Sequence, residues 1–508
     1  MFSAPPHTHH ISNYHKGDIA IHLNDLTDES QGECKVGMAT AAALFAIPSG
    51  APLELEVTIP LEPKDKPALV HGWDAALSST AKLRVPDSTL QKLYDEALRT
   101  VVLCSPDDAF PGTFTYKRFW FRDAAYMVFA LLQAGLIDRA ERAVGNFFKR
   151  QNISGYFHSQ DGEWDSNGQV LWTMEQLCRF KGISPPNEWT KAIVSGARWI
   201  ARKRVRDASG KPHQGLLPAG FSAEHLGPND FYYWDDFWSV SGLESAARML
   251  DELGLNDESA EFKAEAGDLL GAIRHSLDFA YGRLRSRTMP AAPERRMDAG
   301  AIGSIVSGYP LQIEKPDSPE LLATVDFLLD HCSHEGAFFQ DMVHSGVNPY
   351  LTLHLAQIQM RAGNPRYAEL RDTVAGLATS TGQWPEAIHP RTGGGCMGDG
   401  QHAWAAAEWI SMMRQSFVRE EGDDLVLGAG VDPRWLESGE AFGISNAPTH
   451  FGNLDLYFEP FEDSIRVRWH GEWHRQPATV TLALPGRPQR ELTEPIGILD
   501  LNSILPGA

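Results

Sequence analysis

The sequence has few cysteines, and none of them stands close to another. Its 508 residues contain five, at positions 34, 104, 178, 332 and 396. An odd number of widely spaced cysteines is typical of reduced thiols and argues against a disulfide framework or a paired-cysteine zinc site. The first residues also lack a basic segment followed by an apolar run, so no signal peptide is expected. Both features indicate a cytoplasmic protein.

Long apolar runs and an excess of positive charge are missing too. No run of about 18 apolar residues occurs, so we expect no membrane span. Lysine and arginine number 45 against 66 aspartates and glutamates, which gives a net charge of -21. Because nucleic acid is a polyanion, this charge argues against it as a partner. It also disfavours polyanionic sugars, whereas neutral ligands carry no such penalty.

Several catalytic signatures are absent as well. The sequence holds no Gly-x-Ser-x-Gly element, no Walker A loop and no dinucleotide-binding fingerprint in the required context. The glycines at 393–395 follow no predicted strand, so they are not interpreted as a phosphate loop. We expect no metal and no organic cofactor.

The chain divides by pattern into three parts, and its length allows two or three domains. Residues 1–85 and 421–508 show the two-residue alternation of half-buried strands, and residues 86–420 show helical spacing. The alternating apolar segments are 53–59, 454–458, 465–469 and 480–484. The pattern leaves open whether the two β regions form one sandwich or contact the helical part separately.

The central part predicts about a dozen helices. Good start signals stand at Pro86-Asp87-Ser88 and at Ser318-Pro319-Glu320. The predicted helices lie near 88–103, 122–134, 137–149, 168–181, 187–205, 235–253, 257–281, 299–306, 318–331, 347–362, 364–379 and 401–417.

These helices are of two kinds. Residues 123–134 and 401–410 are apolar or small on most faces, which is typical of buried helices, whereas 258–266 is amphipathic. Alternation of buried with amphipathic helices predicts a closed double ring, with six inner and six outer helices.

Glu386 lies in a loop of unusual composition. It follows Trp384-Pro385 and precedes the three glycines, and a helix begins near residue 401. Proline fixes the backbone and the glycines allow tight turns. An ordinary connection between helices needs only a few residues, so this loop favours a functional carboxylate over a solvated one.

Glu224 is a second carboxylate in aromatic surroundings, since Phe231-Tyr-Tyr-Trp234 follows it. A carboxyl pressed against aromatic rings loses hydration, which favours its protonated form and suits a general acid. Asp235 and Asp236 are alternatives for that role, although capping of the next helix also explains them. Two such acids are what cleavage of a glycosidic bond requires.

Two further segments carry candidate sugar-binding groups. Arg122 and Asp123 stand side by side after Trp120 and can grip two hydroxyls, unless they are a structural ion pair at a helix start. Trp164 and Asp165 precede another helix, where the tryptophan can stack on a sugar ring; a plain turn or N-cap is the alternative.

These motifs, in this order, resemble those of the six-hairpin glycosidases, especially glucoamylases and their bacterial trehalase-like relatives. The resemblance covers roughly residues 86 to 417 and rests on Trp120-Phe-Arg-Asp-Ala-Ala125, Trp164–Gln169, the Glu224 region and Pro385–Gly393. It implies a mainly α protein built on an (α/α)6 barrel with flanking β-sandwich-like elements at both termini.

The resemblance also implies roles. Glu386 becomes the general base that activates water and Glu224 the general acid, in an inverting reaction. The implied substrate-binding residues are Trp120, Arg122, Asp123, Trp164, Asp165, Tyr233, Trp234, Asp235 and Trp384. The family has tryptophan before its acid, whereas this chain has Ala223, so Asp235 and Asp236 stay open as alternatives.

The sequence therefore predicts an exo-acting glycoside hydrolase with an oligosaccharide as its partner. The expected substrate is neutral, α-linked and glucose-containing. One alternative keeps the fold and uses phosphate in place of water, which requires a cationic pocket near Glu386. The other alternative is a sugar-binding protein without catalysis.

Overall fold

The computed structural model describes residues 1–17, 19–25, 31–35, 39–58, 72–221, 228–341, 346–461, 464–493 and 496–500. It contains two compact units, Met1–His71 and Gly72–Ala508. The predicted domain boundaries at residues 85 and 420 stay a prediction. No helix of the described residues combines the length and apolar character needed to cross a bilayer.

The first unit contains a two-stranded antiparallel sheet, β1 (Thr8–Ser12) with β2 (Thr40–Leu44), and a short 3-10 helix, η1 (Ile19–His22). The strand expected at 53–59 is wrong for its described part, because only Val57 pairs, in a single bridge to Phe2. Leu53 is 38% exposed and Val57 54%, so the alternation has no buried face to support a strand. Ile59 lies outside the described residues.

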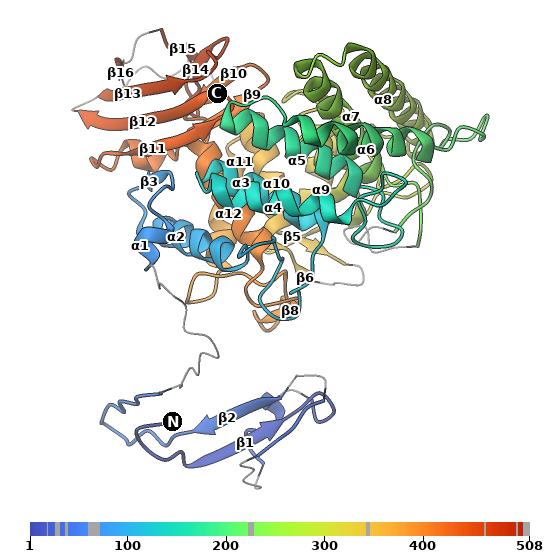
Figure 1. Ribbon diagram of the computed structural model, residues 1–508. Coiled ribbons are helices and arrows are strands. Elements are labelled where there is room, and N and C mark those ends of the chain that lie inside the picture. Colours follow the sequence, from blue (N-terminus) through green and yellow to red (C-terminus); the bar gives the residue numbers. More distant parts are fainter. Residues whose placement is uncertain are drawn as a thin grey trace. The chain divides into compact units, whose positions relative to one another are not determined.

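The second unit is built on a closed double ring of helices (Figure 1). The inner members are α3 (Phe121–Gln133), α5 (Ser166–Lys181), α7 (Tyr233–Glu252), η4 (Ala299–Ser307), α10 (Pro349–Arg361) and α12 (Ala403–Phe417). Each contacts the next, and α12 contacts α3, so the ring closes. The outer members are α2 (Ser88–Leu103), α4 (Ile137–Phe147), α6 (Thr190–Lys203), α8 (Asn256–Leu284), α9 (Pro319–His331) and α11 (Arg366–Gly376). The predicted (α/α)6 architecture is confirmed.

Burial explains which helices lie inside. Every residue of α3 and of α12 is buried, whereas α8 buries one stripe that includes Phe262, Leu269 and Ile273. The inner position at 299–307 is a 3-10 helix, and the Asp298 carboxylate accepts a hydrogen bond from its Gly300 N–H at 3.0 Å. Short helices α1 (Trp73–Ala76), η2 (Phe148–Arg150), η3 (Asn187–Trp189) and α13 (Pro433–Leu436) complete the set.

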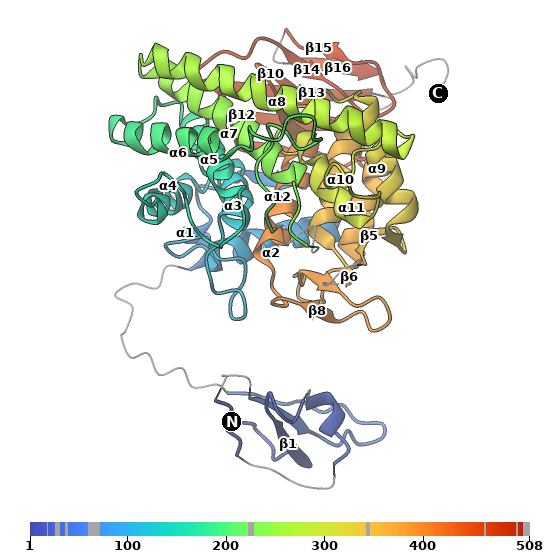
Figure 2. The same cartoon turned by 90° about the vertical axis from the view of Figure 1, so that its right-hand side faces the viewer.

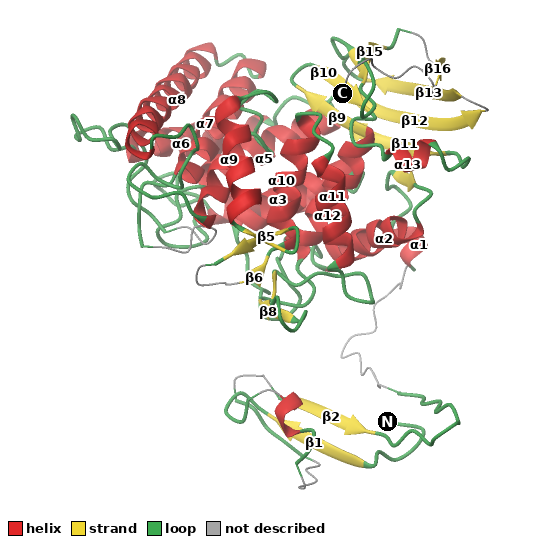
Figure 3. Ribbon diagram, turned by 180° about the vertical axis from the view of Figure 1, so that it is seen from behind, coloured by secondary structure: helices red, strands yellow, loops and turns green. Residues whose placement is uncertain are grey.

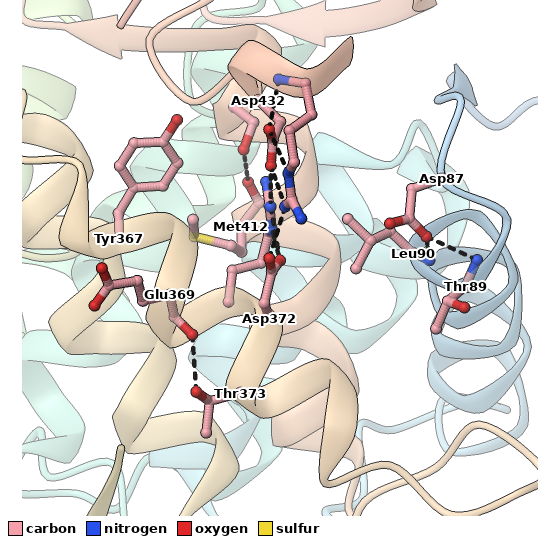
Figure 4. A network of polar contacts seen from close by, with 12 residues as sticks. Asp87, Thr89, Leu90, Tyr367, Glu369, Asp372, Thr373, Met412 and Asp432 are labelled. Atoms are coloured by element: carbon pink, nitrogen blue, oxygen red, sulfur yellow. Dashed lines mark hydrogen bonds and ion pairs between the residues drawn. The ribbon is translucent and has the colours of Figure 1, made fainter. Parts of the chain in front are cut away.

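The predicted start signals act as helix caps. The Asp87 carboxylate accepts from the N–H groups of Thr89 and Leu90 at 2.9 and 3.0 Å, which caps α2 (Figure 4). Ser318 caps α9 through the Leu321 N–H. Both side chains satisfy backbone donors that a helix start leaves without partners.

Two sheets follow the ring and pack together. Their strand orders are β15-β14-β10-β9 and β16-β13-β12-β11-β3. The bounds are β3 (Lys82–Arg84), β9 (Val418–Glu421), β10 (Asp424–Leu427), β11 (Phe442–Thr449), β12 (Gly452–Phe461), β13 (Ser464–Trp473), β14 (Val480–Leu482), β15 (Arg490–Glu491) and β16 (Ile496–Asp500). The alternation expected at 454–458 is confirmed, since Leu454, Leu456 and Phe458 are buried. Strand β3 precedes the ring in sequence and joins the second sheet through β11.

An ionic cluster connects an outer helix to this region (Figure 4). The Asp432 carboxylate, before α13, accepts from Arg371 of α11 at 2.6 Å and from Arg434 at 2.5 Å. Burial alone would raise the pKa of Asp432, but these hydrogen bonds outweigh it and hold the pKa well below its usual range. The buried guanidinium of Arg371 is thereby paired.

The inner helices run in parallel, so the ring has two different ends. A small sheet of β4 (Ser333–His334), β5 (Ala337–Gln340), β6 (Gly346–Val347), β7 (Ala387–Ile388) and β8 (Gly395–Met397) lies at their N-terminal end. Figures 1 and 2 place β5, β6 and β8 at one end of the helices and the sheets of β9 to β16 at the other. Figure 3 shows the same order from behind, with helices between two groups of strands.

Glycines allow two inner helices to touch. A Cβ at Gly242 of α7 would lie 2.5 Å from the Cα of Gly168 of α5, so neither position has room for a side chain. We expect Gly242→Ala to destabilise the fold by about 1–3 kcal/mol or more, because the backbones must separate.

The matched control is Gly267→Ala on α8, where a Cβ would meet nothing within 4 Å. This change should stabilise the chain by up to about 1 kcal/mol through helix propensity. Urea unfolding of both variants measures the difference, and equal stabilities would contradict the close approach of α5 and α7.

Candidate active site

Arg122 occupies the centre of a buried polar network at the N-terminal end of the ring. Its Nε donates to Oδ2 of Asp165 at 3.0 Å, and its Nη2 lies 3.3 Å from Oε1 of Glu163. The same Asp165 oxygen accepts from Nε1 of Trp234 at 2.8 Å and from Gln169 at 2.9 Å. The structure thus brings together Arg122, Asp165 and Trp234 from three inner helix starts.

The structure shows that Asp165 is not a plain helix cap. The residue stands at the N-cap position of α5 but makes no capping hydrogen bond with its side chain. Its carboxylate instead accepts hydrogen bonds from the guanidinium of Arg122 and the indole of Trp234, so Asp165 is not a plain helix cap. Asn167 has a structural role, because its amide bonds the backbone of Phe157, Gly155 and Gly196.

Asp123 follows Arg122 and is almost fully buried. Burial raises the pKa of Asp123, Arg122 opposes this shift and the charge of Glu386 adds to it, and the net pKa is about 7. His402, at the start of α12, places Nε2 3.9 Å from Oδ1 of Asp123. Burial lowers the pKa of His402 to about 3, so the imidazole is neutral. Asp123 therefore changes charge near neutral pH.

Glu386 lies immediately before β7 and is held by a tyrosine. The hydroxyl of Tyr116 donates to Oε2 of Glu386 at 2.5 Å. Gly398, with a φ of +66°, leaves the space that this contact needs, since a Cβ there would lie 3.0 Å from the same oxygen. Burial, together with the charge of Glu386, raises the pKa of Tyr116, so the phenol stays protonated and remains a donor.

Asp399 fixes the loop that carries Tyr116. Its carboxylate accepts from the N–H groups of Thr115 and Tyr116, both at 2.8 Å. Tyr116, Asp399 and Glu163 were not among the predicted site residues. Glu163 directly precedes the predicted residue Trp164, and Asp399 lies in the same loop as Glu386. Tyr116, by contrast, is 270 residues from Glu386 and carries no local signal.

Two predicted tryptophans are partly accessible. Trp120 donates to Oε1 of Gln160 at 2.9 Å and packs edge-on against Tyr116 with ring centroids 5.7 Å apart. It is half-buried and adjacent to the Glu386 pair, so its ring can contact a ligand. Trp164 is also half-buried, and the ammonium of Lys203 lies 3.7 Å from its ring centroid.

Two other predicted aromatics lie in the core. The hydroxyl of Tyr233 is 2.8 Å from that of Ser276 on the outer helix α8. Trp384 donates to the Val374 carbonyl at 2.8 Å and packs against Trp409. Neighbouring residues at a helix start project about 100° apart, so Trp234 and Tyr233 cannot both face Asp165. The structure does not bring Tyr233 and Trp384 to the network.

The acidic pair at the start of α7 does not cap the helix, contrary to the capping interpretation. Asp235 is buried, and neither carboxyl oxygen has a hydrogen-bond partner among the described residues. Burial and the neighbouring Asp165 raise its pKa well above the ordinary range. Asp236 accepts from the Leu217 N–H at 2.8 Å, and burial raises its pKa to about 8.

Glu224 lies outside the described residues, but both ends of its segment are described. The Phe221 N–H donates to the Gly162 carbonyl at 2.8 Å, and Gly220 forms an antiparallel bridge with Asp230. The segment therefore begins beside the turn that carries Glu163, Trp164 and Asp165.

Asp236 predicts a measurable pH dependence of stability. Its pKa rises on folding from about 3.8 to about 8, so the folded chain holds this proton more tightly than the unfolded chain. Its contribution to stability is therefore present below pH 4 and is lost as pH rises toward 8. Asparagine cannot ionise, so the variant Asp236→Asn does not lose this contribution. We expect its free energy of unfolding, relative to that of the wild type, to increase by up to roughly 5 kcal/mol when the pH is raised from 4 to 8.

Urea unfolding of Asp236→Asn and of the wild type at both pH values measures this gain. A stability difference that is the same at pH 4 and at pH 8 would show that Asp236 does not titrate as described.

No protein-family profile matches the sequence, and no curated protein matches it. Several solved structures, however, match the fold of this chain. A bacterial glucoamylase in complex with acarbose aligns with a TM-score of 0.51 and 13% identity, over 68% of this chain and 57% of that one. A GH78 family rhamnosidase from a Bacillus species aligns with a TM-score of 0.58 and 14% identity, over 80% and 43%. A rhamnosidase from Klebsiella oxytoca with rhamnose bound gives 0.51 and 13%, over 67% of each.

This chain thus spans little more than half of the glucoamylase and less than half of the Bacillus rhamnosidase. At identities this low the likeness concerns the fold. The chain shares its (α/α)6 fold with these glucoamylase and rhamnosidase structures, as the motif resemblance implied.

Proposed function

We propose that this protein is an exo-acting glycoside hydrolase, with Glu386 as the general base that activates water. The observation that carries the proposal is the Tyr116–Glu386 hydrogen bond at 2.5 Å, beside the buried carboxyl of Asp123. Tyr116 binds one carboxylate oxygen and fixes the orientation of the group. A carboxylate whose orientation is fixed in this way suits a general base that takes a proton from water.

The buried network supplies the subsite for the sugar before the cleaved bond. Arg122 is held by Asp165 and Glu163, so its side chain is rigid before any ligand arrives. Asp123 and Arg122 offer an acceptor and donors for adjacent sugar hydroxyls. Trp120, next to Tyr116, offers an apolar face for the ring. These groups suit a neutral sugar, and we propose an α-linked, glucose-containing oligosaccharide.

Glu224 is the proposed general acid, in line with the motif resemblance. Phe221, the last described residue before Glu224, donates its N–H to the carbonyl of Gly162, which precedes Glu163. An inverting reaction requires carboxyl groups about 6.5–9.5 Å apart, which leaves room for water. Asp235 is the alternative acid, because burial raises the pKa of its carboxyl well above the usual range and so favours the protonated form.

Hydrolysis is favoured over phosphorolysis by charge. Asp123, Asp399 and Glu386 all lie close enough to Tyr116 to interact with it electrostatically. This end of the ring therefore carries several acidic side chains. A phosphate anion there would meet repulsion. Water carries no charge and meets none.

The role of Glu386 is tested by Glu386→Gln. We expect kcat to fall by about 10²–10⁴-fold on an α-linked glucose disaccharide, while the sugar still binds, because a neutral amide cannot accept the proton from water. Glu437→Gln, at an exposed glutamate, is the control and should keep full activity. Unchanged turnover in Glu386→Gln would refute the proposed base and would leave a sugar-binding protein as the better account.

The acid is identified by comparing Glu224→Gln with Asp235→Asn. A general acid is needed for a poor leaving group and is dispensable for fluoride, which leaves without protonation. We expect Glu224→Gln to lose about 10²–10⁴-fold on the disaccharide and to keep most activity on the glycosyl fluoride.

Asp235→Asn should instead affect both substrates equally, as a structural or binding residue would. The reverse pattern would transfer the role of general acid to Asp235.

A further inference from the structure

Tyr116 contacts two points of one loop, residues 386–402, which leads into α12. Its hydroxyl donates to Oε2 of Glu386, at the start of this loop, at 2.5 Å. Its backbone N–H donates to Oδ2 of Asp399, near the end of the loop, at 2.8 Å. The loop also contains the three successive glycines at 393–395. Tyr116 therefore joins the two ends of a loop whose own backbone has much conformational freedom.

Asp399 binds the backbone of the Tyr116 segment at three successive residues. Its carboxylate also accepts from the N–H of Phe114 at 3.3 Å and from that of Thr115 at 2.8 Å. Both carboxylate oxygens are used, and the residue is only 8% exposed. An aspartate suits this position because its side chain offers two acceptors and no donor, whereas an asparagine would turn an amino group toward N–H donors. We call Asp399 and these three N–H groups the Asp399 clamp.

Two glycines leave the room that the clamp needs. A Cβ at Gly112 would lie 2.0 Å from Oδ2 of Asp399, so a side chain there would displace the carboxylate. A Cβ at Gly398 would lie 2.7 Å from the ring of Tyr116. Gly400, directly after Asp399, has nothing within 4 Å of its Cβ position. The crowding is therefore found at the two glycines that face the clamp and the tyrosine, and not at their neighbour.

The ring of Tyr116 is confined by two further residues of the candidate site. It packs edge-on against Trp120, with ring centroids 5.7 Å apart, and against His402, with centroids 6.3 Å apart. Together with the close approach of Gly398, these contacts leave the side chain little room to rotate. The position of its hydroxyl therefore depends on where the backbone of residue 116 is held, and Asp399 holds it.

We propose that Asp399 is a positioning residue for the reaction, which acts on the base Glu386 through Tyr116 and does not touch the substrate. The proposal rests on the hydrolase function proposed above and extends it to a second acid of the same loop. A reacting group that is misplaced by about 1 Å can lose about 10²-fold in rate. The clamp prevents such a shift by fixing the tyrosine that orients the base.

Two variants disturb the clamp from opposite sides. Asp399→Asn removes an acceptor, and Gly112→Ala pushes the carboxylate away. We expect each to lower kcat on the hydrolysed disaccharide by about 10–10²-fold, because the base is no longer held in place. KM should stay within about threefold of the wild type, since the network around Arg122 is untouched. Gly400→Ala is the matched control for the glycine change and should keep full activity.

A double-mutant cycle separates positioning from a general effect on the fold. In the Tyr116→Phe background the hydroxyl is already absent, so the clamp has nothing left to position. Asp399→Asn and Gly112→Ala should then each lower kcat by less than about twofold. Losses that are as large in this background as in the wild type would overturn the proposal, as would an unchanged kcat in both single variants. Urea unfolding checks that each variant is folded, and Gly112→Ala decides the matter if Asp399→Asn is not.

Hydrogen exchange at the amides of residues 114–116 distinguishes failure of this proposal from failure of the hydrolase function, because exchange does not depend on turnover. We expect faster exchange in Asp399→Asn than in the wild type and in Gly400→Ala. Unchanged exchange overturns the clamp, whatever the activity of the wild type. If exchange is faster but the wild type hydrolyses no saccharide, the hydrolase function has failed, and the catalytic role of Asp399 is overturned with it.

Discussion

The pairing of the buried Arg122 guanidinium with Asp165 and Glu163 is the interaction on which the candidate site depends. A guanidinium buried without a partner costs several kcal/mol, so these contacts must persist for the fold to persist. They join α3 to the turn before α5, and Trp234 adds α7 through the same Asp165 oxygen. Three inner helices are thus fixed in register at the end where the chemistry is proposed.

The same burial that stabilises this pairing also sets the protonation of its neighbours. Burial raises the pKa values of Asp123, Asp235 and Asp236, and it also raises that of Glu163 despite the contact of Glu163 with Arg122. His402 responds in the opposite direction and stays neutral. One end of the ring therefore holds several carboxyl groups whose protonated form is favoured by burial, which suits a general acid. The opposite end holds carboxylates that are paired with arginines, such as Glu175 with Arg248 and Glu421 with Arg361.

The sequence predicted the ring well and the site only in part. Helical periodicity is strong where a helix must bury one face or all faces, so the dozen segments and the caps at Asp87 and Ser318 could be located. The strand expected at 53–59 failed because alternation does not reveal whether a neighbouring strand exists. Arg122, Asp165 and Trp234 meet as the motifs suggested, whereas Tyr233 and Trp384 face the core. The direction of the Tyr233 side chain depends on how the helix is rotated about its axis, and that of Trp384 depends on the backbone path of its loop. The sequence composition does not determine either. Tyr116 could not be found, since its contact with Glu386 exists only after the ring closes.

The proposed reaction requires that water approach the anomeric carbon of the sugar from one face while the glycosidic bond breaks on the opposite face. Proton NMR of the sugar released in the first moments of reaction, before mutarotation, measures this most directly. The account predicts that an α-linked substrate gives the β-anomer as first product, because Glu386 directs water in a single displacement. Release of the α-anomer as first product would contradict it, since retention proceeds through a covalent intermediate and not through a single displacement by water.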